Sequence, residues 1–469
     1  MSAVVADQTT TITTNLYPVW DGWGTSLAWW AKAFGDRDDL ADIFFTLDWT
    51  DWAPGNETLP GLGLNIVRYN AGACSWNTIN GSVTMEASPN IPEAKQIPGY
   101  WLDGSNADPS SDRWDWGKDA NQRSMMLKAQ KRGANVFELF SNSPMWWQLS
   151  NLNPSGAENG GDNLPPFNYD EHAIYLANIA KYAQDHWGIT FNSIEPFNEP
   201  AADWWVATGD QEGCHFDATS QAALIPILRR QMEDRDLRST IISASDESTF
   251  DMAWGTWNTI GEDIQKADIG RTNTHGYQGY SGPRYKLQQA ARNVGQKVWD
   301  SEYGDDDASG DTTITNLMLD IRWLQPNAWV YWQALDVPGW GLINADIDTS
   351  SLSSASHKYF ELAHFTRHIR PGMRVLDTDS GNVIPAIDTD SNRLVIVAAN
   401  WDDAQTLTFD LSSFSEVPAD GSTVRSWVTD RAGDSLYARH DDVTIENGMI
   451  SVEIEKGTVQ TFELDGVAI

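Results

Sequence analysis

The chain has 469 residues and a mass of 52.2 kDa, which is enough for one large α/β domain and a smaller second domain. Its 66 acidic residues against 31 basic ones give a net charge of −35, which opposes a general affinity for nucleic acid or anionic lipid and favours a neutral ligand. Its apolar runs stay shorter than the roughly 18 residues of a membrane span, and its opening, MSAVVADQTT, lacks the basic and apolar parts of a signal peptide.

Short β-rich runs alternate with amphipathic helical patterns over most of the chain. Eight candidate strands follow one another at residues 24–30, 63–70, 134–140, 189–197, 240–245, 268–275, 297–303 and 328–335. Helical patterns lie between them at residues 170–188, 221–234, 283–295 and 313–326. Eight strand-then-helix units favour an α/β fold of the closed (β/α)8 TIM barrel type over a doubly wound sheet, and the sequence has no glycine-rich nucleotide motif.

Active sites of such barrels lie at the carboxyl ends of the strands. The loops after the second, third and fourth strands start near Ala71, Ser141 and Ala201, and they are long and rich in Gly, Asn, Pro and Trp. Long loops on one face of a barrel are typical of a binding cleft.

The sequence pattern changes after YFELAHFTRHIRPG, residues 359–372. Alternating apolar stretches separated by Asp/Ser/Gly turns then follow, at residues 393–400, 406–411, 423–429, 449–455 and 458–464. They predict an antiparallel β-sandwich, which the N-terminal TTTITTN, residues 9–15, could join as a further strand. We therefore expect a catalytic barrel at residues 17–370 and a β-sandwich side domain made from residues 1–16 and 371–469.

Tryptophan is unusually frequent, with 24 residues against 15 Phe and 13 Tyr. We expect most indoles in the core. Loop indoles suit stacking on pyranose rings, and the loop positions are Trp76, Trp101, Trp114, Trp116, Trp146, Trp147, Trp204, Trp205 and Trp340. The two cysteines, Cys74 and Cys214, exclude a disulfide framework but could form one bridge. His364 and His368 lack the glutamate of an H-E-x-x-H motif, so we expect no metal and no cofactor.

Two glutamates at strand ends are the candidate catalytic groups. Glu199 ends the fourth predicted strand and Glu302 the seventh, so both face the mouth of the barrel. Two carboxylates in one cleft are the minimum requirement for cleaving a glycosidic bond, one as proton donor and the other as nucleophile. Asp300 lies two residues before Glu302 on the same predicted face and is the main rival nucleophile.

Polar and aromatic residues near the other strand ends complete the candidate site. Asn198 precedes Glu199, and both can reach one ligand only where the strand bulges or frays. His275 and Tyr277 follow the sixth strand and could reach Glu302, and a tyrosine donor would keep that carboxylate ionised. The further candidates for substrate binding are Arg68, Asn70, Asn142 and Trp332. Asp246 and Glu247 end the fifth strand and either bind substrate or lie at the surface.

These motifs resemble glycoside hydrolase family 30, whose members are retaining enzymes with a (β/α)8 barrel and an attached β-sandwich. GWGTSLAWWA is similar to the first barrel strand of that family, EPFNEP to its acid/base motif, and WDSEYGD to its nucleophile motif. The exit FTRHIRPG, residues 365–372, is the more specific signature, because Asn-Glu-Pro occurs in many barrel glycosidases. The combination of EPFNEPAADWW with QEGCHF is similar to the endo-β-1,6-galactanase branch.

The resemblance implies specific roles for residues of this chain. Glu199 would be the acid/base and Glu302 the nucleophile. The implied neighbours in the site are Asn198, Arg68, His275, Tyr277 and Trp332. The chain has Trp29 and Trp30 where related glucosylceramidases have an acidic residue, which fits a different sugar. We add Trp30, and Trp205 of the acid/base motif, to the expected substrate-binding residues.

The expected function is a retaining β-glycosidase that cuts β-1,6-linked galactan, as in type II arabinogalactan side chains. The alternatives are another activity of the family, namely a β-1,6-glucanase, a glucuronoxylanase or an exo-β-glycosidase, and a catalytically silent carbohydrate-binding protein. Endo or exo action stays open. We expect a monomer with a galactooligosaccharide as partner, and no nucleic acid or membrane. The opening segment leaves an intracellular protein or one that has lost a targeting segment, and the resemblance favours an extracellular or cell-surface location.

Overall fold

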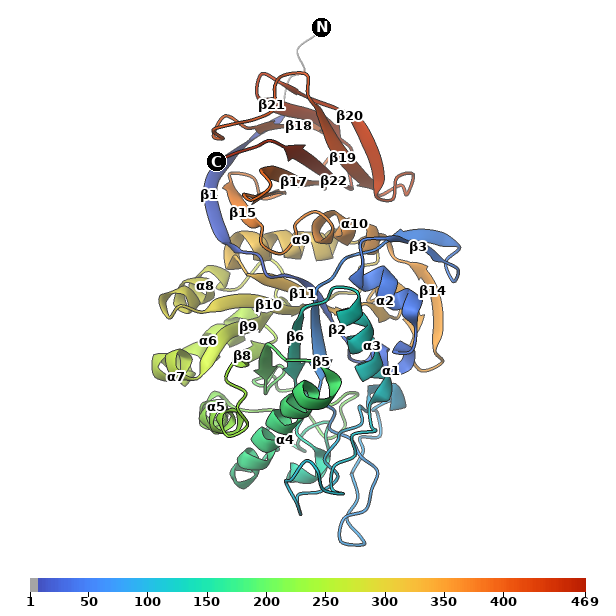
Figure 1. Cartoon of the computed structure of the whole chain (residues 1–469), viewed down its shortest axis with the longest axis vertical. Coiled ribbons are helices and arrows are strands. Elements are labelled where there is room, and N and C mark those ends of the chain that lie inside the picture. Colours follow the sequence, from blue (N-terminus) through green and yellow to red (C-terminus); the bar gives the residue numbers. More distant parts are fainter. Residues whose placement is uncertain (1–6) are drawn as a thin grey trace.

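The computed structural model describes residues 7–469, except for the side chains of residues 441 and 442. Residues 1–6 of the predicted N-terminal segment lie outside the described residues. Figure 1 shows two bodies, an α/β barrel in the lower part of the view and a β domain above it, joined by strand β1 and helix α10.

Eight parallel strands close into the expected barrel, which confirms the (β/α)8 prediction. In order around the barrel they are β10 (Lys297–Tyr303), β11 (Ala328–Gln333), β2 (Gly22–Ser26), β5 (Ile66–Asn70), β6 (Val136–Phe140), β7 (Ser193–Glu195), β8 (Ile241–Glu247) and β9 (Ile269–His275). These strands are almost entirely buried on both faces, as expected for a parallel sheet covered by helices. The last strand in this order pairs with the first, so the sheet has no open edge.

Helices cover the outside of the barrel. They are α1 (Trp30–Phe34), α2 (Asp38–Phe45), α3 (Ala120–Lys131), α4 (Tyr169–Tyr182), α5 (Ala218–Glu233), α6 (Phe250–Ile260), α7 (Glu262–Ala267), α8 (Arg284–Asn293), α9 (Asp311–Leu319) and α10 (His357–Thr366). Helices α4 and α9 each run into one π-helical turn, η4 (Ala183–Trp187) and η5 (Asp320–Leu324). Gly188 ends the first of these in the left-handed conformation, where the sequence predicts a stop.

Long loops follow β5, β6 and β7, as expected, and those after β5 and β6 are drawn at the bottom of Figure 1. They contain the short 3-10 turns η1 (Glu93–Lys95), η2 (Trp146–Gln148) and η3 (Pro166–Asn168). Two small sheets stand beside the barrel. One pairs β3 (Trp49–Trp52) with β4 (Glu57–Pro60), and the other joins β12 (Leu335–Asp336), β13 (Ile343–Asp346) and β14 (Ser351–Ala355).

The second domain corrects the sandwich prediction, because its nine strands form a closed barrel. Their order is β1 (Gln8–Val19), β15 (Arg374–Thr378), β16 (Val383–Asp388), β17 (Arg393–Asn400), β22 (Thr458–Asp465), β19 (Thr423–Asp430), β20 (Ala438–Glu446), β21 (Met449–Ile454) and β18 (Gln405–Asp410). The N-terminal strand β1 joins this domain as expected. It closes the barrel by pairing antiparallel with β15 and parallel with β18.

Helix α10 and the turn that follows it pack against the β domain through His364 and His368. The His364 ring contacts the hydroxyls of Thr461 at 2.8 Å and Thr429 at 2.9 Å. His368 contacts Glu463 at 2.8 Å and the Tyr437 hydroxyl at 2.6 Å. Both side chains therefore act in domain packing, and their i, i+4 spacing needs no other explanation.

The two cysteines do not pair. Cys74 and Cys214 are both free and buried, so the bridge that the sequence left open does not form. The Cys74 thiol lies 3.1 Å from a carboxylate oxygen of Glu212. Within residues 7–469, none of the helices is at once long enough and apolar enough to cross a membrane.

Candidate active site

A cavity of about 430 Å³ opens at the carboxyl ends of the barrel strands. Its lining combines polar and aromatic side chains. The lining residues are Trp29, Asn142, Asn198, Glu199, Trp204, Gln211, Ser248, Thr249, Tyr277, Glu302, Trp332 and Trp340. Both predicted catalytic glutamates are among them, together with four of the predicted substrate-binding residues.

The backbone around Glu199 is no longer a regular strand, which is the condition under which Asn198 and Glu199 can both reach one ligand. Strand β7 ends at Glu195, and Glu199 has a φ of 48°, in the left-handed region that non-glycine residues rarely adopt. Its N–H donates to the Asp246 carbonyl at 2.8 Å, and its carbonyl accepts from the Trp205 indole at 2.8 Å. This turn brings both Asn198 and Glu199 to the cavity, and the two hydrogen bonds hold the strained residue in place.

Glu302 reaches the cavity because strand β10 is irregular just before it. The register of β10 against β9 shifts between Asp300 and Glu302. Asp300 is therefore turned away from the cavity into the helix layer, where it is fully buried beside Asp320, and that burial and Asp320 raise its pKa well above the ordinary value. The prediction that Asp300 shares a face with Glu302 is wrong, because alternation fails at a bulge.

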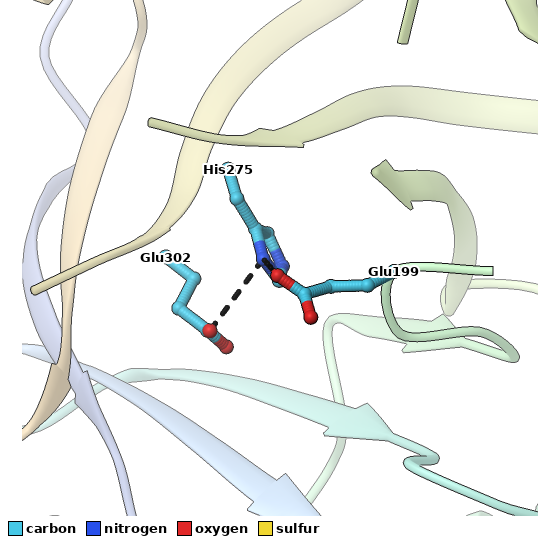
Figure 2. A group of neighbouring side chains, drawn as sticks. All are labelled: Glu199, His275 and Glu302. Carbon is cyan, nitrogen blue, oxygen red and sulfur yellow. Dashed lines mark hydrogen bonds and ion pairs between the residues drawn. The ribbon is translucent and has the colours of Figure 1, made fainter. Parts of the chain in front are cut away.

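The carboxylates of Glu199 and Glu302 lie close together. Figure 2 shows their side chains pointing toward each other, with the His275 ring between them. One oxygen of each carboxylate and a His275 nitrogen all lie within 4.8 Å of one another. Retaining glycosidases hold their two carboxyl groups about 5–5.5 Å apart, whereas inverting enzymes need about 6.5–9.5 Å to admit a water. The separation here suits double displacement.

Arg68 holds Glu302 from below. This fully buried guanidinium donates to Glu302 at 2.9 Å and to Glu138 at 3.1 Å, and it also pairs with Asp246. Its flat face lies 4.2 Å from the Phe140 ring centroid. An arginine buried among three carboxylates keeps its charge. Arg68 therefore orients the nucleophile candidate but does not line the cavity.

His275 and Tyr277 contact the two glutamates from β9 and the loop after it. The Nδ1 atom of His275 lies 3.2 Å from Glu199 and 3.5 Å from Glu302, and its Nε2 lies 3.2 Å from Asp246. Burial alone would lower the pKa of His275, but the carboxylates of Glu302 and Asp246 outweigh it and raise the pKa to about 10. The Tyr277 hydroxyl donates to Glu302 at 3.0 Å, as the sequence predicted.

Basic and acidic side chains alternate in this buried cluster. Arg68, Arg271 and His275 contact the carboxyl groups of Glu138, Asp246 and Glu302. Burial would raise the pKa of Asp246, but Arg68 and His275 outweigh it and lower the pKa to about 2. Burial raises the pKa of Glu302, while His275 and Arg68 oppose that rise.

The three candidate asparagines have different placements. Asn198 and Asn142 line the cavity, and the side-chain oxygen of Asn198 is buried without a hydrogen-bond partner among the described residues. Asn70 is fully buried beneath them. Its side-chain oxygen accepts from the Asn142 N–H at 3.4 Å, and its amide donates to Glu212 at 3.4 Å. The structure thus places Asn70 in support of the loop and leaves Asn198 with a free acceptor.

Tryptophans form the walls, but not all of those predicted. Trp332 lines the cavity, with its ring centroid 5.1 Å from that of Trp29 in an edge-on contact. Trp30, the other member of the predicted pair, is fully buried in helix α1, where it packs edge-on against Phe44. Trp205 is likewise buried, and its neighbour Trp204 faces the cavity.

Most loop indoles pack on one another and not toward the cavity. The Trp101 and Trp114 rings stack at 4.9 Å, and Trp116 stacks on Trp114 at 5.1 Å and on Tyr182 at 3.7 Å. Of the loop tryptophans named from the sequence, Trp204 and Trp340 line the cavity. Trp76 is 57% exposed, and the remaining ones are buried or half-buried in the long loops.

Several residues of the site escaped the sequence reasoning. Gln211, Ser248 and Thr249 line the cavity, and short polar residues in loops carry no distinguishing signal. Asp246 and Glu247 are fully buried, so the surface alternative is wrong for both. Glu195 ends strand β7 and is fully buried, with both oxygens unpartnered among the described residues. Burial, with Asp246 and Glu138 nearby, raises its pKa well above the ordinary value.

Glu199, His275 and Glu302 also form the one group with metal-ligand geometry in the described part of the chain. Their donor atoms are already engaged. Arg68 and Tyr277 each donate to an oxygen of Glu302, and His275 contacts Glu199 through Nδ1. A cation here would displace Arg68 or face it at short range, so the residues do not fit a metal.

A (β/α)8 barrel with a close carboxylate pair at its mouth defines a glycoside hydrolase of the two-carboxylate class. The model of O-glycosyl hydrolase family 30 matches residues 2–268, and the chain belongs to this family. It is 52% identical to an endo-beta-1,6-galactanase of Hypocrea rufa over 99% of this chain and 96% of that protein.

Two further comparisons are more distant. An exo-beta-1,6-galactobiohydrolase of Bifidobacterium longum subsp. longum is 22% identical over 91% of this chain and 36% of its own length. The crystal structure of a conserved exported protein from Bacteroides fragilis matches with a TM-score of 0.76 at 17% identity, over 97% of this chain and all of that one. The latter likeness supports the two-domain fold.

Proposed function

We propose that this protein hydrolyses β-1,6-linked galactan, as in type II arabinogalactan side chains, with retention of anomeric configuration. The observation that carries the proposal is the close pair Glu199 and Glu302 in a chain 52% identical to an endo-beta-1,6-galactanase over nearly its whole length. An identity that high over both chains makes a shared substrate class the first hypothesis.

In the first step, Glu302 attacks the anomeric carbon and Glu199 gives its proton to the departing glycosidic oxygen. Arg68 and Tyr277 each hold one oxygen of Glu302, at 2.9 and 3.0 Å, which orients the carboxylate and keeps it ionised. The product of this step is a galactosyl ester on Glu302 and a free leaving chain.

In the second step, Glu199, now ionised, takes a proton from a water that attacks the ester, and Glu302 leaves as carboxylate. His275 lies between both carboxylates, and the Glu302 and Asp246 carboxylates raise its pKa to about 10, which favours its charged form. It stabilises whichever glutamate is ionised, so one fixed cation serves both steps.

The cavity supplies contacts to the sugar on either side of the reacting bond. The unpartnered oxygen of Asn198 can accept a hydroxyl proton, and Gln211, Ser248 and Thr249 offer further polar groups. Trp29, Trp204, Trp332 and Trp340 offer flat apolar surfaces of the kind that pack on the faces of pyranose rings.

A time course on three polymers tests the proposal. Purified protein is incubated with β-1,6-galactan, β-1,6-glucan and glucuronoxylan, and products are separated by length, with Glu302→Gln as the matched inactive control. We expect products from galactan alone. A ladder of lengths indicates endo cutting, and one dominant short product indicates exo action. Equal turnover of glucan or xylan, or full activity in Glu302→Gln, overturns the proposal.

We also propose that the protein acts outside the cell and as a monomer. A polymeric substrate cannot enter a cell intact, which favours an extracellular or cell-surface enzyme. The cavity is lined by residues of one chain, so a second copy is not needed to complete it. Fractionation of the producing cells and light scattering of the purified protein test the two statements separately.

A further inference from the structure

A second cleft lies between the two domains, on the side of the barrel away from the active site. It has a volume of about 440 Å³ and is formed by β1 and β15 of the β domain and by α8 and η5 of the barrel. Figure 1 shows α8 on the left, beneath β1 and β15. The lining residues are Asn15, Leu16, Tyr17, Tyr285, Arg292, Arg322, Trp323, Gln325, Asp377 and Thr378.

This cleft continues into a smaller hollow of about 270 Å³ that shares Arg292 and Gln325 with it. The hollow is also lined by Lys297 and Val298, at the start of strand β10. Glu302 lies toward the other end of the same strand. The two hollows therefore open at the amino ends of the barrel strands, opposite the catalytic cavity.

The charge of the cleft is unusual for this chain. Although acidic residues outnumber basic ones by 66 to 31, neither Arg292 nor Arg322 has a carboxylate within ion-pair distance among residues 7–469. Arg292 donates to the Gln325 side chain at 3.0 Å, and Arg322 donates to the Ser380 carbonyl. Both guanidinium groups thus keep donors that can serve a ligand.

The one acidic residue in the lining is already occupied. Asp377 accepts from the Tyr17 hydroxyl at 3.0 Å and from the Thr378 N–H at 3.0 Å through the same oxygen. These hydrogen bonds hold the Asp377 side chain against β1 and its own strand β15. The cleft therefore presents two unpaired cations against one engaged anion.

Aromatic rings stand beside the two arginines. Trp323 is 48% exposed and Tyr285 is 52% exposed, although large aromatic side chains on an outer helix layer are normally buried. The Arg322 guanidinium lies 5.4 Å from the Trp323 ring centroid. Exposed rings of this kind give a flat apolar surface next to the charge, while Asn15 and Gln325 add amide groups.

We infer that this cleft is a second, non-catalytic carbohydrate site that binds a saccharide bearing a carboxylate group, such as a uronic acid residue. Guanidinium groups bind carboxylates through paired hydrogen bonds, aromatic rings pack on pyranose faces, and amides bind sugar hydroxyls. The volume is in the range of ordinary small-ligand pockets, about 300–1,000 Å³.

The inference goes beyond the proposed galactan hydrolysis and does not depend on it. The site would hold an acidic polysaccharide at the end of the barrel away from Glu302, which keeps the enzyme on a polymer between cuts. The carboxylate could belong to a uronic acid on the galactan side chain itself or to a different acidic polysaccharide in the same material.

Affinity electrophoresis of the uncleaving Glu302→Gln protein tests the site. Native gels contain arabinogalactan, carboxyl-reduced arabinogalactan or polygalacturonate. We expect retardation by at least one acidic polymer and weaker retardation by the reduced polymer, whose galactan chains can still bind in the catalytic cavity. Arabinogalactan alone identifies the substrate as the source of the uronate, and retardation by polygalacturonate identifies a general uronate site. Both results support the inference, and equal retardation by the reduced polymer overturns it.

Added substitutions assign the binding to the cleft. In the Glu302→Gln background, Arg292→Gln with Arg322→Gln should weaken binding by about tenfold or more, since each arginine would lose a charge-assisted hydrogen bond. The matched control is Arg238→Gln, an exposed arginine that pairs with Asp236 at 3.5 Å and lies outside the cleft. Trp323→Ala provides a second variant, because Arg322 also links the two domains through Ser380.

Circular dichroism checks that each variant is folded. Unchanged retardation in both folded cleft variants overturns the inference, and so does an equal loss in Arg238→Gln. Because the assay measures binding by an inactive protein, a failure of the proposed galactan hydrolysis leaves this result unaffected.

Discussion

Replacing Tyr277 by phenylalanine should change how activity depends on pH. The Tyr277 hydroxyl donates to Glu302 at 3.0 Å and so stabilises the ionised form of the proposed nucleophile. Burial raises the pKa of Glu302, and loss of this donor raises it further. A hydrogen bond to a charged group contributes about 1.5–3 kcal/mol, which corresponds to about 10- to 150-fold in the ionised fraction on the acid side of the profile.

The expected loss lies near the lower end, about tenfold, because the hydroxyl borders the cavity and a water can replace part of the bond. The assay is kcat/KM on a β-1,6-galactooligosaccharide across the acid limb and the plateau. Activity at low pH should fall about tenfold, while the plateau changes much less. Tyr303→Phe is the matched control, because its hydroxyl donates to Asp305, at 3.1 Å, and not to Glu302. An acid limb of Tyr277→Phe that overlays the wild-type limb would refute the reasoning.

Three further outcomes follow from the site. Trp205→Phe removes the 2.8 Å hydrogen bond from the indole to the Glu199 carbonyl. Because a neutral hydrogen bond contributes about 0.5–1.5 kcal/mol, kcat/KM should fall about 2- to 10-fold. An unchanged kcat/KM would contradict the role of Trp205 in positioning Glu199. Glu195 has a raised pKa in the folded state, so the stability it contributes is present at low pH and is lost as pH rises. The midpoint temperature of thermal unfolding should therefore fall less toward alkaline pH in Glu195→Gln than in the wild type. Equal falls in the two proteins would contradict this prediction. Prolonged EDTA treatment should leave activity unchanged, because the donor atoms of Glu199, His275 and Glu302 are already engaged, and a loss restored by a divalent cation would contradict this.

The barrel and its carboxylate pair were predictable because both depend on local patterns. The barrel strands are short apolar runs that alternate with segments of helical periodicity. The strand predicted at residues 297–303 matches the observed bounds of β10. Residues that end parallel strands must meet at one edge of the barrel. Glu199 and Glu302 could therefore be paired without knowledge of their distance in space.

Side-chain direction was less predictable where regular structure ends. Simple alternation put Asp300 beside Glu302, but the register shift between them turns Asp300 into the helix layer. Strand β2 ends at Ser26 and helix α1 starts at Trp30, so the strand expected to reach residue 30 stops early and Trp30 turns into the core. Strand β8 continues to Glu247, which buries Asp246 and Glu247, two acids for which the shorter predicted strand left surface exposure and substrate binding both open.

Long-range pairing accounts for the remaining differences. Whether the second domain is a sandwich or a closed barrel depends on β1 pairing with β18, for example Thr9 with Thr408, and sequence periodicity contains no information on such partners. The stacking of tryptophans in the long loops could not be predicted for the same reason. Trp114 and Trp204 look alike as loop indoles, yet one stacks on other rings and the other lines the cavity.

The identity of the nucleophile is the central claim, and trapping the glycosyl ester tests it most directly. A 2-deoxy-2-fluoro galactoside with a good leaving group slows both chemical steps, and the leaving group lets the ester form faster than it breaks down. Mass spectrometry of the digested protein then locates the sugar. We predict a label on Glu302 within WDSEYGD. A label on Asp300 or Glu199, or a protein that turns over substrate with no ester ever accumulating, would contradict the account.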